Sequence, residues 1–278
     1  MAHYQDVIHF LSNHLPITNV PEFIIMYICK DMIDWFSIPC KIQQHIEIQY
    51  CETTVNDSKK ETRLWNNLHS RCDQPAIEWI DGTKEWWKNG LRHRNYDLPA
   101  IEWTDGRKEW WKNNELHRDN DLPAVERADD TKEWWKNDQR HRDNDLPAVE
   151  YASGIKSWYK KGKLHRDHDL PAIEWVHHRE WYKNGQLHRD NDLPAVEWYD
   201  GTKKWYKNGQ LHRDHDLPAV ENASGSKLWY KHGQQHRDHD SHAVECADGY
   251  KEWWKNGQLY RDHDLPIIEY ADGRKEYK

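Results

Sequence analysis

The chain has 278 residues, a formal net charge of -8 and 32% charged residues, against only 36% hydrophobic residues. The acidic balance excludes general affinity for nucleic acids or anionic membranes, because both require an excess of basic charge. A composition this polar is typical of disordered chains, but the 18 Trp and 14 Tyr supply large apolar surfaces that favour a folded protein.

The same composition bears on the cellular compartment. No window approaches the roughly 20 apolar residues of a transmembrane helix, and the first residues contain no recognisable signal peptide. The five cysteines are odd in number and follow no paired spacing. We therefore expect a reducing, intracellular (cytoplasmic) setting.

Residues 1–45 differ in composition from the rest of the chain, since all three Phe and all three Met lie within the first 36 positions. Apolar residues at helical spacing predict two short helices over residues 4–13 and 21–36, separated by prolines. These helices are too small to form a core alone, so we expect them to cap one end of the remaining chain.

Residues 46–278 are predicted to form an array of repeats. Residues 46–50 alternate between apolar and polar side chains, which predicts a first strand within a degenerate first unit over 46–72. Regular units begin at residue 73, where prolines recur every 24 residues except for one spacing of 23 between Pro171 and Pro194. His242 occupies one of the proline positions. Repetition at this period is the signature of a repeat architecture.

The unit that starts at Pro194 predicts an antiparallel β-meander. The expected elements are a strand over 195–199, a two-residue turn at Asp200-Gly201, a second strand over 203–207, a hairpin turn at Asn208-Gly209, a third extended segment over 210–213 and a polar loop over 214–218. The turn glycines of the array are Gly82, Gly90, Gly106, Gly154, Gly162, Gly185, Gly201, Gly209, Gly225, Gly233, Gly249, Gly257 and Gly273. Tight turns at fixed offsets are a strong hairpin signal, so the predicted fold class is an all-β array of hairpin units, elongated and capped by N-terminal helices.

A pair of aromatic residues occupies the second predicted strand of each unit. Adjacent residues of a strand point to opposite faces, so we expect one ring of each pair on each face and two structural aromatic ladders along the array. The ladder residues are Trp86, Trp87, Trp110, Trp111, Trp134, Trp135, Trp158, Tyr159, Trp181, Tyr182, Trp205, Tyr206, Trp229, Tyr230, Trp253 and Trp254.

The run from Trp205 to His212 and the segment from Tyr270 to Tyr277 resemble MORN repeats, over about residues 60–278. The resemblance lies in the Tyr-x-Asp-Gly turn, the Trp-x-x-Gly segment and the following His, whereas His-Arg-Asp-x-Asp-Leu-Pro-Ala replaces the family's His-Gly-x-Gly. It implies a scaffold for protein contacts, in some members near membranes, with no catalytic residue to carry over. Peripheral membrane association therefore stays open.

Two further resemblances concern origin and partners. Variant repeats of this kind resemble proteins of large DNA viruses of amoebae, which implies a viral protein associated with the virion. The segment from Leu15 to Ile25 resembles the start of an F-box, which implies recruitment of a ubiquitin-ligase adaptor.

The repeated His-Arg-Asp segment resembles the catalytic loop of protein kinases, but the Gly-rich loop and the Asp-Phe-Gly motif of that family are missing. It occurs at His117, His141, His165, His188, His212 and His236. The following His of some copies is Asn in others, which keeps a turn former and loses a ligand. We expect a structural loop, with metal binding as the alternative.

The arginine of each His-Arg step has a candidate partner in the next repeat. The candidates are Glu102, Glu126, Glu150, Glu174, Glu197, Glu221 and Glu245. Ion pairs that set the repeat register are the first interpretation, and a groove for an acidic partner is the second. Interleaved aromatic and basic residues also suit single-stranded nucleic acid or carbohydrate, but the acidic balance argues against nucleic acid.

These observations predict a protein that is not an enzyme, with no catalytic residue, cofactor or metal site. The expected function is a structural or interaction scaffold that binds a protein partner. The alternative is a ubiquitin-ligase adaptor whose N-terminal part docks the ligase and whose repeats select the target. The sequence identifies neither the partner nor the oligomeric state.

Overall fold

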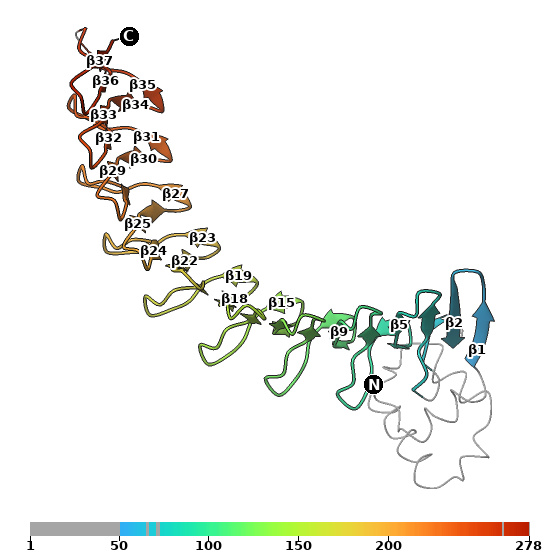
Figure 1. Cartoon of the computed structure of the whole chain (residues 1–278). Helices are drawn as coiled ribbons and strands as arrows, with labels where there is room; N and C mark the ends of the chain where they lie inside the picture. Colours follow the sequence, from blue (N-terminus) through green and yellow to red (C-terminus); the bar gives the residue numbers. More distant parts are fainter. Residues whose placement is uncertain (1–50, 65–66, 71–72, 263, 278) are drawn as a thin grey trace, which may run out of the picture. The chain divides into compact units, whose positions relative to one another are not determined.

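The computed structural model describes residues 51–64, 67–70, 73–262 and 264–277 (Figure 1). The two predicted helices, the predicted strand at 46–50 and the F-box-like segment lie outside these residues. Every regular element within the described part is a β-strand, and no helix there could cross a membrane. The all-β array of antiparallel hairpins is therefore confirmed.

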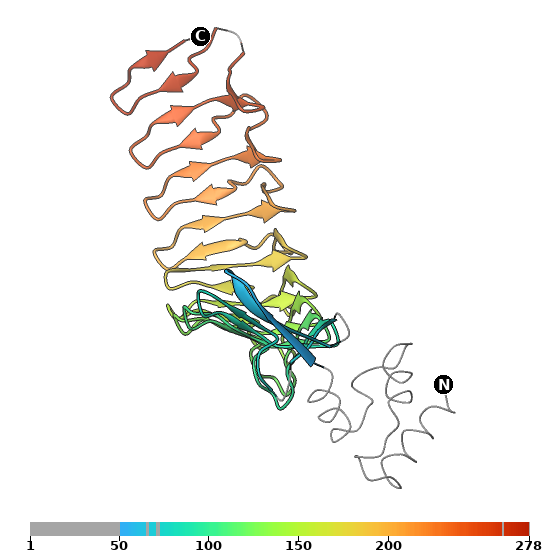
Figure 2. The ribbon, with the colours of Figure 1, turned by 90° about the vertical axis from the view of Figure 1, so that its right-hand side faces the viewer.

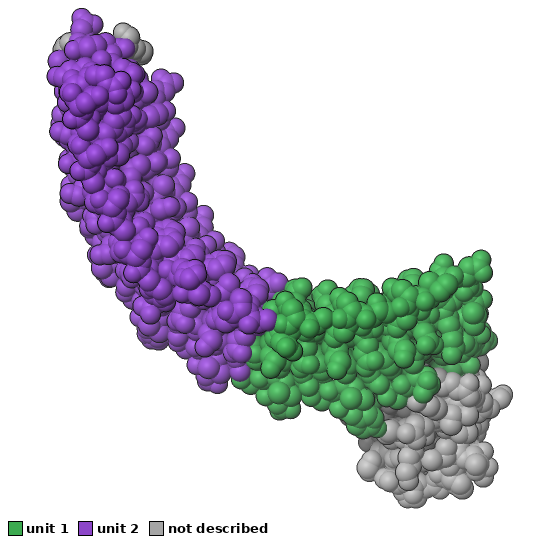
Figure 3. Space-filling model, viewed as in Figure 1, with its two compact units in different colours: residues 1–138 green, residues 139–278 purple. Residues whose placement is uncertain are grey.

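The chain divides within the repeats into two compact units, residues 1–138 and 139–278 (Figure 3).

In unit 1, a long antiparallel sheet takes two strands from each regular repeat. Its strands are β1 (Cys51–Val55), β2 (Lys59–Leu64), β3 (Asn67–Leu68), β4 (Ile77–Trp79), β5 (Lys84–Glu85), β8 (Ile101–Glu102), β9 (Lys108–Glu109), β12 (Val125–Glu126) and β13 (Lys132–Glu133). Small hairpins lie outside this sheet, formed by β6 (Trp87–Lys88) with β7 (Leu91–Arg92) and by β10 (Trp111–Lys112) with β11 (Glu115–Leu116). β14 (Trp135–Lys136) is the corresponding strand of the last repeat in this unit.

Unit 2 repeats the same plan, and Figure 2 shows the strands of its successive repeats side by side. Its sheet strands are β16 (Val149–Glu150), β17 (Lys156–Ser157), β20 (Ile173–Glu174), β21 (His178–Glu180), β24 (Val196–Trp198), β25 (Lys203–Lys204), β28 (Val220–Glu221), β29 (Lys227–Leu228), β32 (Val244–Glu245), β33 (Lys251–Glu252), β36 (Ile268–Glu269) and β37 (Lys275–Glu276). Its other strands are β15 (Gln139–Arg140) and the hairpin pairs β18 (Tyr159–Lys160) with β19 (Lys163–Leu164), β22 (Tyr182–Lys183) with β23 (Gln186–Leu187), β26 (Tyr206–Lys207) with β27 (Gln210–Leu211), β30 (Tyr230–Lys231) with β31 (Gln234–Gln235) and β34 (Trp254–Lys255) with β35 (Gln258–Leu259).

The predicted second strand over 203–207 is wrong, because the chain leaves the sheet at Trp205. β25 pairs with β24 and β28 in the long sheet, whereas β26 pairs only with β27. The backbone N–H of Trp205 donates to the carbonyl of Ala219 in the next repeat, and its carbonyl accepts from the N–H of His212. Trp205 thus connects the ladder of the long sheet to the ladder of the small hairpin. The third extended segment, predicted over 210–213, ends at Leu211.

The two predicted turns have different geometries. Asn208 and Gly209 both have positive φ, 52° and 81°, between the paired residues Lys207 and Gln210, as a two-residue type I′ turn requires. At Asp200-Gly201 only the glycine has positive φ, 98°, and the N–H of Gly201 donates to the carbonyl of Trp198. That turn is a three-residue loop with a bulge at glycine, so the predicted two-residue turn is wrong.

The missing residue of the 23-residue repeat shortens this loop. The N–H of Trp175 donates to the carbonyl of His178 across only Val176 and His177. The strand pairing of β21 with β20 and β24 continues on both sides. A deletion in the turn therefore leaves the register of the sheet intact.

Asp130 occupies the bulge position that glycine holds in neighbouring repeats, with φ of 66°. A side chain in the left-handed region costs free energy that glycine avoids. Relief of the left-handed conformation gains about 1–2 kcal/mol and the chain entropy of glycine costs about 0.5–1 kcal/mol, so replacing Asp130 with glycine (D130G) should raise the free energy of unfolding by up to about 1 kcal/mol. Urea denaturation measures this change. The matched control, Gly106→Ala at φ of 92°, should shift stability in the opposite direction.

The core is a column of small and aromatic side chains rather than one central cluster. Ala195, Val196 and Trp205 are typical, with exposed fractions of 0%, 3% and 6%. Equivalent alanine, valine or isoleucine, and tryptophan residues are buried in the repeats that start at Pro75, Pro99, Pro123, Pro147, Pro171, Pro218 and His242. Because each repeat buries its tryptophan against neighbouring repeats, the array gains apolar burial with few aliphatic residues.

Candidate functional site: the loops between repeats

The first aromatic residue of each pair is fixed to the loop of the preceding repeat. The indole Nε1 of Trp205 donates to the carbonyl oxygen of Asp192 at 2.9 Å. Asp192 and the preceding Asn191 both have positive φ, 54° and 61°, in a turn closed by the N–H of Leu193 on the carbonyl of Asp190. Asn and Asp tolerate this conformation better than most residues, which explains their use in the loop.

The arginine of the His-Arg step covers the same indole. The guanidinium carbon of Arg213 lies 3.8 Å from the ring centroid of Trp205. Its Nε and Nη2 bind the Asp192 carboxylate at 3.0 and 2.9 Å, and its Nη1 donates to the Pro218 carbonyl and to Glu221. A planar guanidinium suits this combination of stacking and bidentate binding.

We call these four residues the junction set: the loop aspartate, the buried tryptophan, the arginine and the glutamate. Besides Asp192, Trp205, Arg213 and Glu221, complete sets within one unit are Asp73–Trp86–Arg94–Glu102, Asp97–Trp110–Arg118–Glu126, Asp145–Trp158–Arg166–Glu174, Asp169–Trp181–Arg189–Glu197 and Asp240–Trp253–Arg261–Glu269. The arginine side chains are only 12–14% exposed. The aspartate and glutamate carboxylates are 30–47% exposed, so the sets differ from exposed ion pairs through their largely buried arginine, which would lack a partner if the carboxylates were removed.

The predicted Arg–Glu pairing is confirmed for most candidates and fails at Glu245. Arg142 also contacts Glu150, at 3.1 Å. Glu245 instead contacts Nε2 of His242, which stands at the proline position. The imidazole of His242 makes edge contacts with both Trp229 and Trp253, at 6.0 and 5.7 Å between centroids. The imidazole of His242 thus lies between two successive junction tryptophans. It binds Glu245, whereas in the complete sets an arginine binds the equivalent glutamate.

The second aromatic residues lie in the small hairpins and are half-buried, unlike the first. Every tryptophan among them follows a glutamate two positions earlier. Where the residue at that position is glutamate, its carboxylate accepts a hydrogen bond from the second aromatic: Glu85 from Trp87, Glu109 from Trp111, Glu133 from Trp135, Glu180 from Tyr182 and Glu252 from Trp254. Where that residue is Ser157, Lys204 or Leu228, the aromatic is tyrosine. The two predicted ladders therefore have different surroundings and different hydrogen bonds.

The histidines of the His-Arg-Asp segments use both ring nitrogens within the array. Nδ1 of His188 accepts the backbone N–H of Asn208 in the next repeat at 3.2 Å, and Nε2 lies 2.9 Å from the Asp190 carboxylate. A backbone donor at Nδ1 places the proton of a neutral ring on Nε2. Within the described ranges, no group of three or more His, Cys, Asp or Glu is arranged to hold a metal ion. Metal binding therefore gains no support from the geometry of these loops.

The aspartate that binds the histidine of each His-Arg-Asp segment, such as Asp214, also binds a lysine. Nζ of Lys207 binds Asp214 at 2.9 Å, and hydrogen bonds from His212 and Lys207 lower the pKa of Asp214 to about 2. Asp167 and Asp238 have the same partners in their repeats, and the pKa of each is also lowered to about 2.

These depressed pKa values predict how stability depends on acid. A carboxyl whose pKa is lower in the folded chain stabilises it above the unfolded pKa, and that contribution falls as pH drops toward the folded pKa. The difference in stability between the wild type and the variant D214N/D238N should therefore not shrink from pH 7 to about 4.5, and it should shrink between pH about 4 and 2. Thermal unfolding followed by circular dichroism measures it. A difference that shrinks already between pH 7 and 5 would contradict this assignment.

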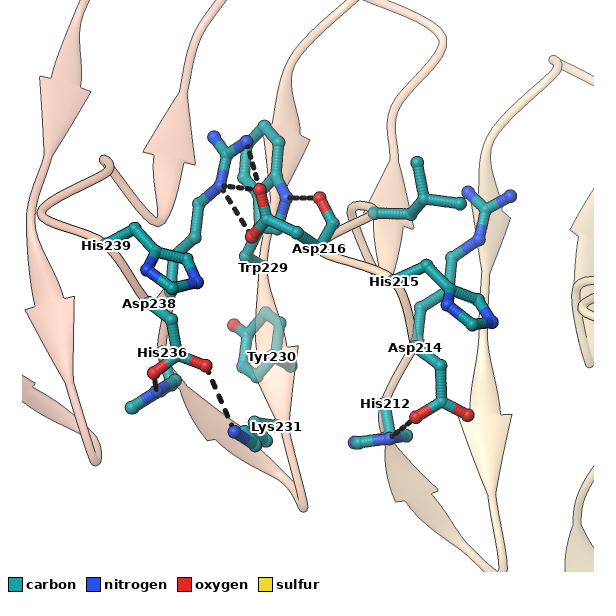
Figure 4. Close-up of a pocket in the computed structure, with 13 residues that line it drawn as sticks. His212, Asp214, His215, Asp216, Trp229, Tyr230, Lys231, His236, Asp238 and His239 are labelled. Atoms are coloured by element: carbon teal, nitrogen blue, oxygen red, sulfur yellow. Dashed lines mark hydrogen bonds and ion pairs between the residues drawn. The ribbon is translucent and has the colours of Figure 1, made fainter.

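Between successive loops lie shallow pockets that the sequence did not predict. In Figure 4, Tyr230 lies between the loop that carries His212, Asp214 and His215 and the loop that carries His236, Asp238 and His239. This pocket has a volume of about 250 Å³. Similar pockets of about 210–250 Å³ surround Tyr159, Tyr182 and Tyr206 in unit 2 and Trp111 in unit 1.

The sequence also missed the loop aspartates and leucines. Asp192 and its equivalents looked like solvated loop residues, although a signal was present, because this aspartate and the arginine 20 or 21 positions later recur in copy after copy. The leucine before each proline is 38–39% exposed at Leu98, Leu122, Leu146, Leu170, Leu193, Leu217 and Leu265. Comparison with known proteins finds no family model that matches the chain and no similar curated protein.

Proposed function

We propose that the chain is a non-catalytic structural or interaction scaffold, in which MORN-like repeats present one surface many times to a protein partner. The observation that carries this proposal is the repetition of the same pocket along the array, with equivalent residues around each copy. A catalytic site brings together groups with different roles at particular positions, whereas a repeated surface suits an extended or multivalent partner.

Two features support a protein partner over a polyanion. The chain is acidic overall, which disfavours nucleic acid. The exposed leucines of the loops and the half-buried tyrosines of the small hairpins offer the apolar contacts that protein interfaces use. The resemblance to MORN-variant repeats of large DNA viruses extends the proposal to a viral, intracellular scaffold associated with the virion.

Affinity purification with quantitative mass spectrometry tests this proposal. The full chain and a variant that lacks residues 1–40 would be isolated from producing cells at native abundance. We expect both chains to recover the same stoichiometric protein partner, because the array makes the contact. Recovery of a ubiquitin-ligase adaptor that disappears on deletion of residues 1–40 would support the adaptor function instead. Isolation of both chains without any stoichiometric partner would contradict the scaffold.

A further inference from the structure

The pockets of unit 2 form a continuous row. The pockets around Tyr159, Tyr182, Tyr206 and Tyr230 follow one another along the chain, and each neighbouring pair shares the loop between them. The segment from His188 to Asn191, for example, lines both the Tyr182 pocket and the Tyr206 pocket. A ligand that leaves one pocket along the array therefore enters the next one directly.

The charges around these pockets are already paired within the protein. In the Tyr230 pocket, Arg237 binds Asp216, Lys231 binds Asp238, and Asp214 is held by His212 and by a lysine of the neighbouring hairpin. A charged ligand would have to compete with these partners. The arrangement therefore disfavours an acidic or a basic peptide that binds through its charges.

Most of the lining is polar, and the uncharged surface that it leaves for a ligand consists of the tyrosine ring, the leucine and the neighbouring imidazoles. Tyr206 and Tyr230 are half-buried, and burial raises the pKa of both hydroxyls, so they stay neutral donors over the physiological range. Leu217 lines the Tyr230 pocket and is 39% exposed. The exposed His215 and His239 lie on the two walls (Figure 4). Aromatic floors with nearby donors are the surfaces on which proline-rich peptides dock.

The spacing of the row selects among peptide conformations. Each repeat adds two strands to the sheet, and adjacent strands are about 4.8 Å apart, so successive repeats, each with one pocket, are about 9.5 Å apart along the sheet. A polyproline II helix has three residues per turn and presents equivalent side chains on one face about every 9.3 Å. In an extended strand, every third residue lies at a similar distance but on the opposite face. The row therefore matches a polyproline II peptide and not a β-strand.

We propose that the unit 2 row binds a proline-rich segment in the polyproline II conformation, with one tyrosine pocket for each turn of about three residues. This inference rests on the proposed scaffold function and names the class of partner. The peptide carbonyls, which make no hydrogen bonds within a polyproline II helix, would accept from donors on the pocket walls. Apolar contact with the tyrosine rings and leucines would supply most of the affinity.

Fluorescence anisotropy with labelled oligoproline tests the proposal on the full chain. We expect a peptide of 12 prolines to bind roughly tenfold or more tightly than one of 6 prolines, because it spans about four pockets instead of two. Raising the salt from about 0.1 to 1 M should change the affinity less than about twofold. A Gly-Ser peptide of equal length should not bind. Equal affinities for the two proline peptides, or strong salt dependence, would overturn the proposal.

Two loop variants locate the binding site. L193S/L217S removes exposed apolar groups from the walls, and Y182A/Y206A removes two pocket floors; each should weaken binding of the longer peptide roughly tenfold. Y199A is the matched control, because Tyr199 is 61% exposed and lines none of these pockets. If the variant Y182A/Y206A unfolds, the binding measurement on L193S/L217S still tests the site. Unchanged binding in L193S/L217S would overturn the proposal. If oligoproline fails while a captured protein partner still binds the array, the polyproline inference is wrong and the scaffold function stands.

Discussion

Replacing Trp205 with alanine should lower the free energy of unfolding by about 3–5 kcal/mol. The indole is 6% exposed, donates its Nε1 proton to Asp192 and lies under the guanidinium of Arg213. The substitution therefore opens a cavity, leaves the Asp192 carbonyl without its donor and removes the surface on which the arginine stacks. Urea denaturation followed by far-UV circular dichroism measures the loss.

Tyr199 provides the control for this substitution. Its ring is 61% exposed in the turn of the same repeat, so Y199A should change stability by less than about 0.5 kcal/mol. Equal losses of stability for the two variants would show that the buried Trp205 contributes no more to the free energy of unfolding than the exposed Tyr199. Conversely, W205F should recover part of the packing and none of the hydrogen bond.

Replacing Arg189 with alanine should cost about 1–3 kcal/mol, although the residue lies in a loop. Its side chain is 13% exposed and binds Asp169 and Glu197, while its guanidinium lies 3.9 Å from the centroid of Trp181. The variant leaves two carboxylates without their shared partner and exposes the indole face. Differential scanning calorimetry and urea denaturation both report this change.

Two variants separate the causes of that loss. R189K keeps the charge and loses the bidentate geometry, so its stability should lie between those of the wild type and R189A. K183A removes an ion pair with Asp190 whose two side chains are 51% and 59% exposed, and it should cost less than about 1 kcal/mol. If R189A cost no more than K183A, the junction set would be an ordinary surface ion pair.

The sequence predicts the repeat and one of its two turns well, and it predicts the strands except for the break within the second one. Asn208-Gly209 is a type I′ turn because both residues accept positive φ, which is a local property of the dipeptide. Asp200-Gly201 has the same local signal, but the strand register there requires a three-residue loop and leaves only glycine in the left-handed region. Register is a property of paired strands, so the dipeptide alone could not distinguish the two turns.

For a related reason, the sequence does not show that the second strand is interrupted at the first aromatic residue of each pair. Trp205-Tyr206 has high β-propensity, and nothing local shows that Trp205 bonds to the next repeat while Tyr206 begins a separate hairpin. The junction sets depend on contacts between residues about 20 positions apart. Only the recurrence of aspartate and arginine among the copies hinted at them, and the shallow pockets between loops are a consequence of side-chain placement that no motif encodes.

The junction set implies that each repeat depends mainly on its neighbours. Hydrogen exchange with mass spectrometry on the full chain with R189A is the most direct test. We predict faster exchange confined to the repeats that contribute Asp169, Trp181, Arg189 and Glu197, with the repeats beyond residue 240 unchanged from the wild type. Uniform acceleration along the described array, or no change at residues 169–197, would contradict the account.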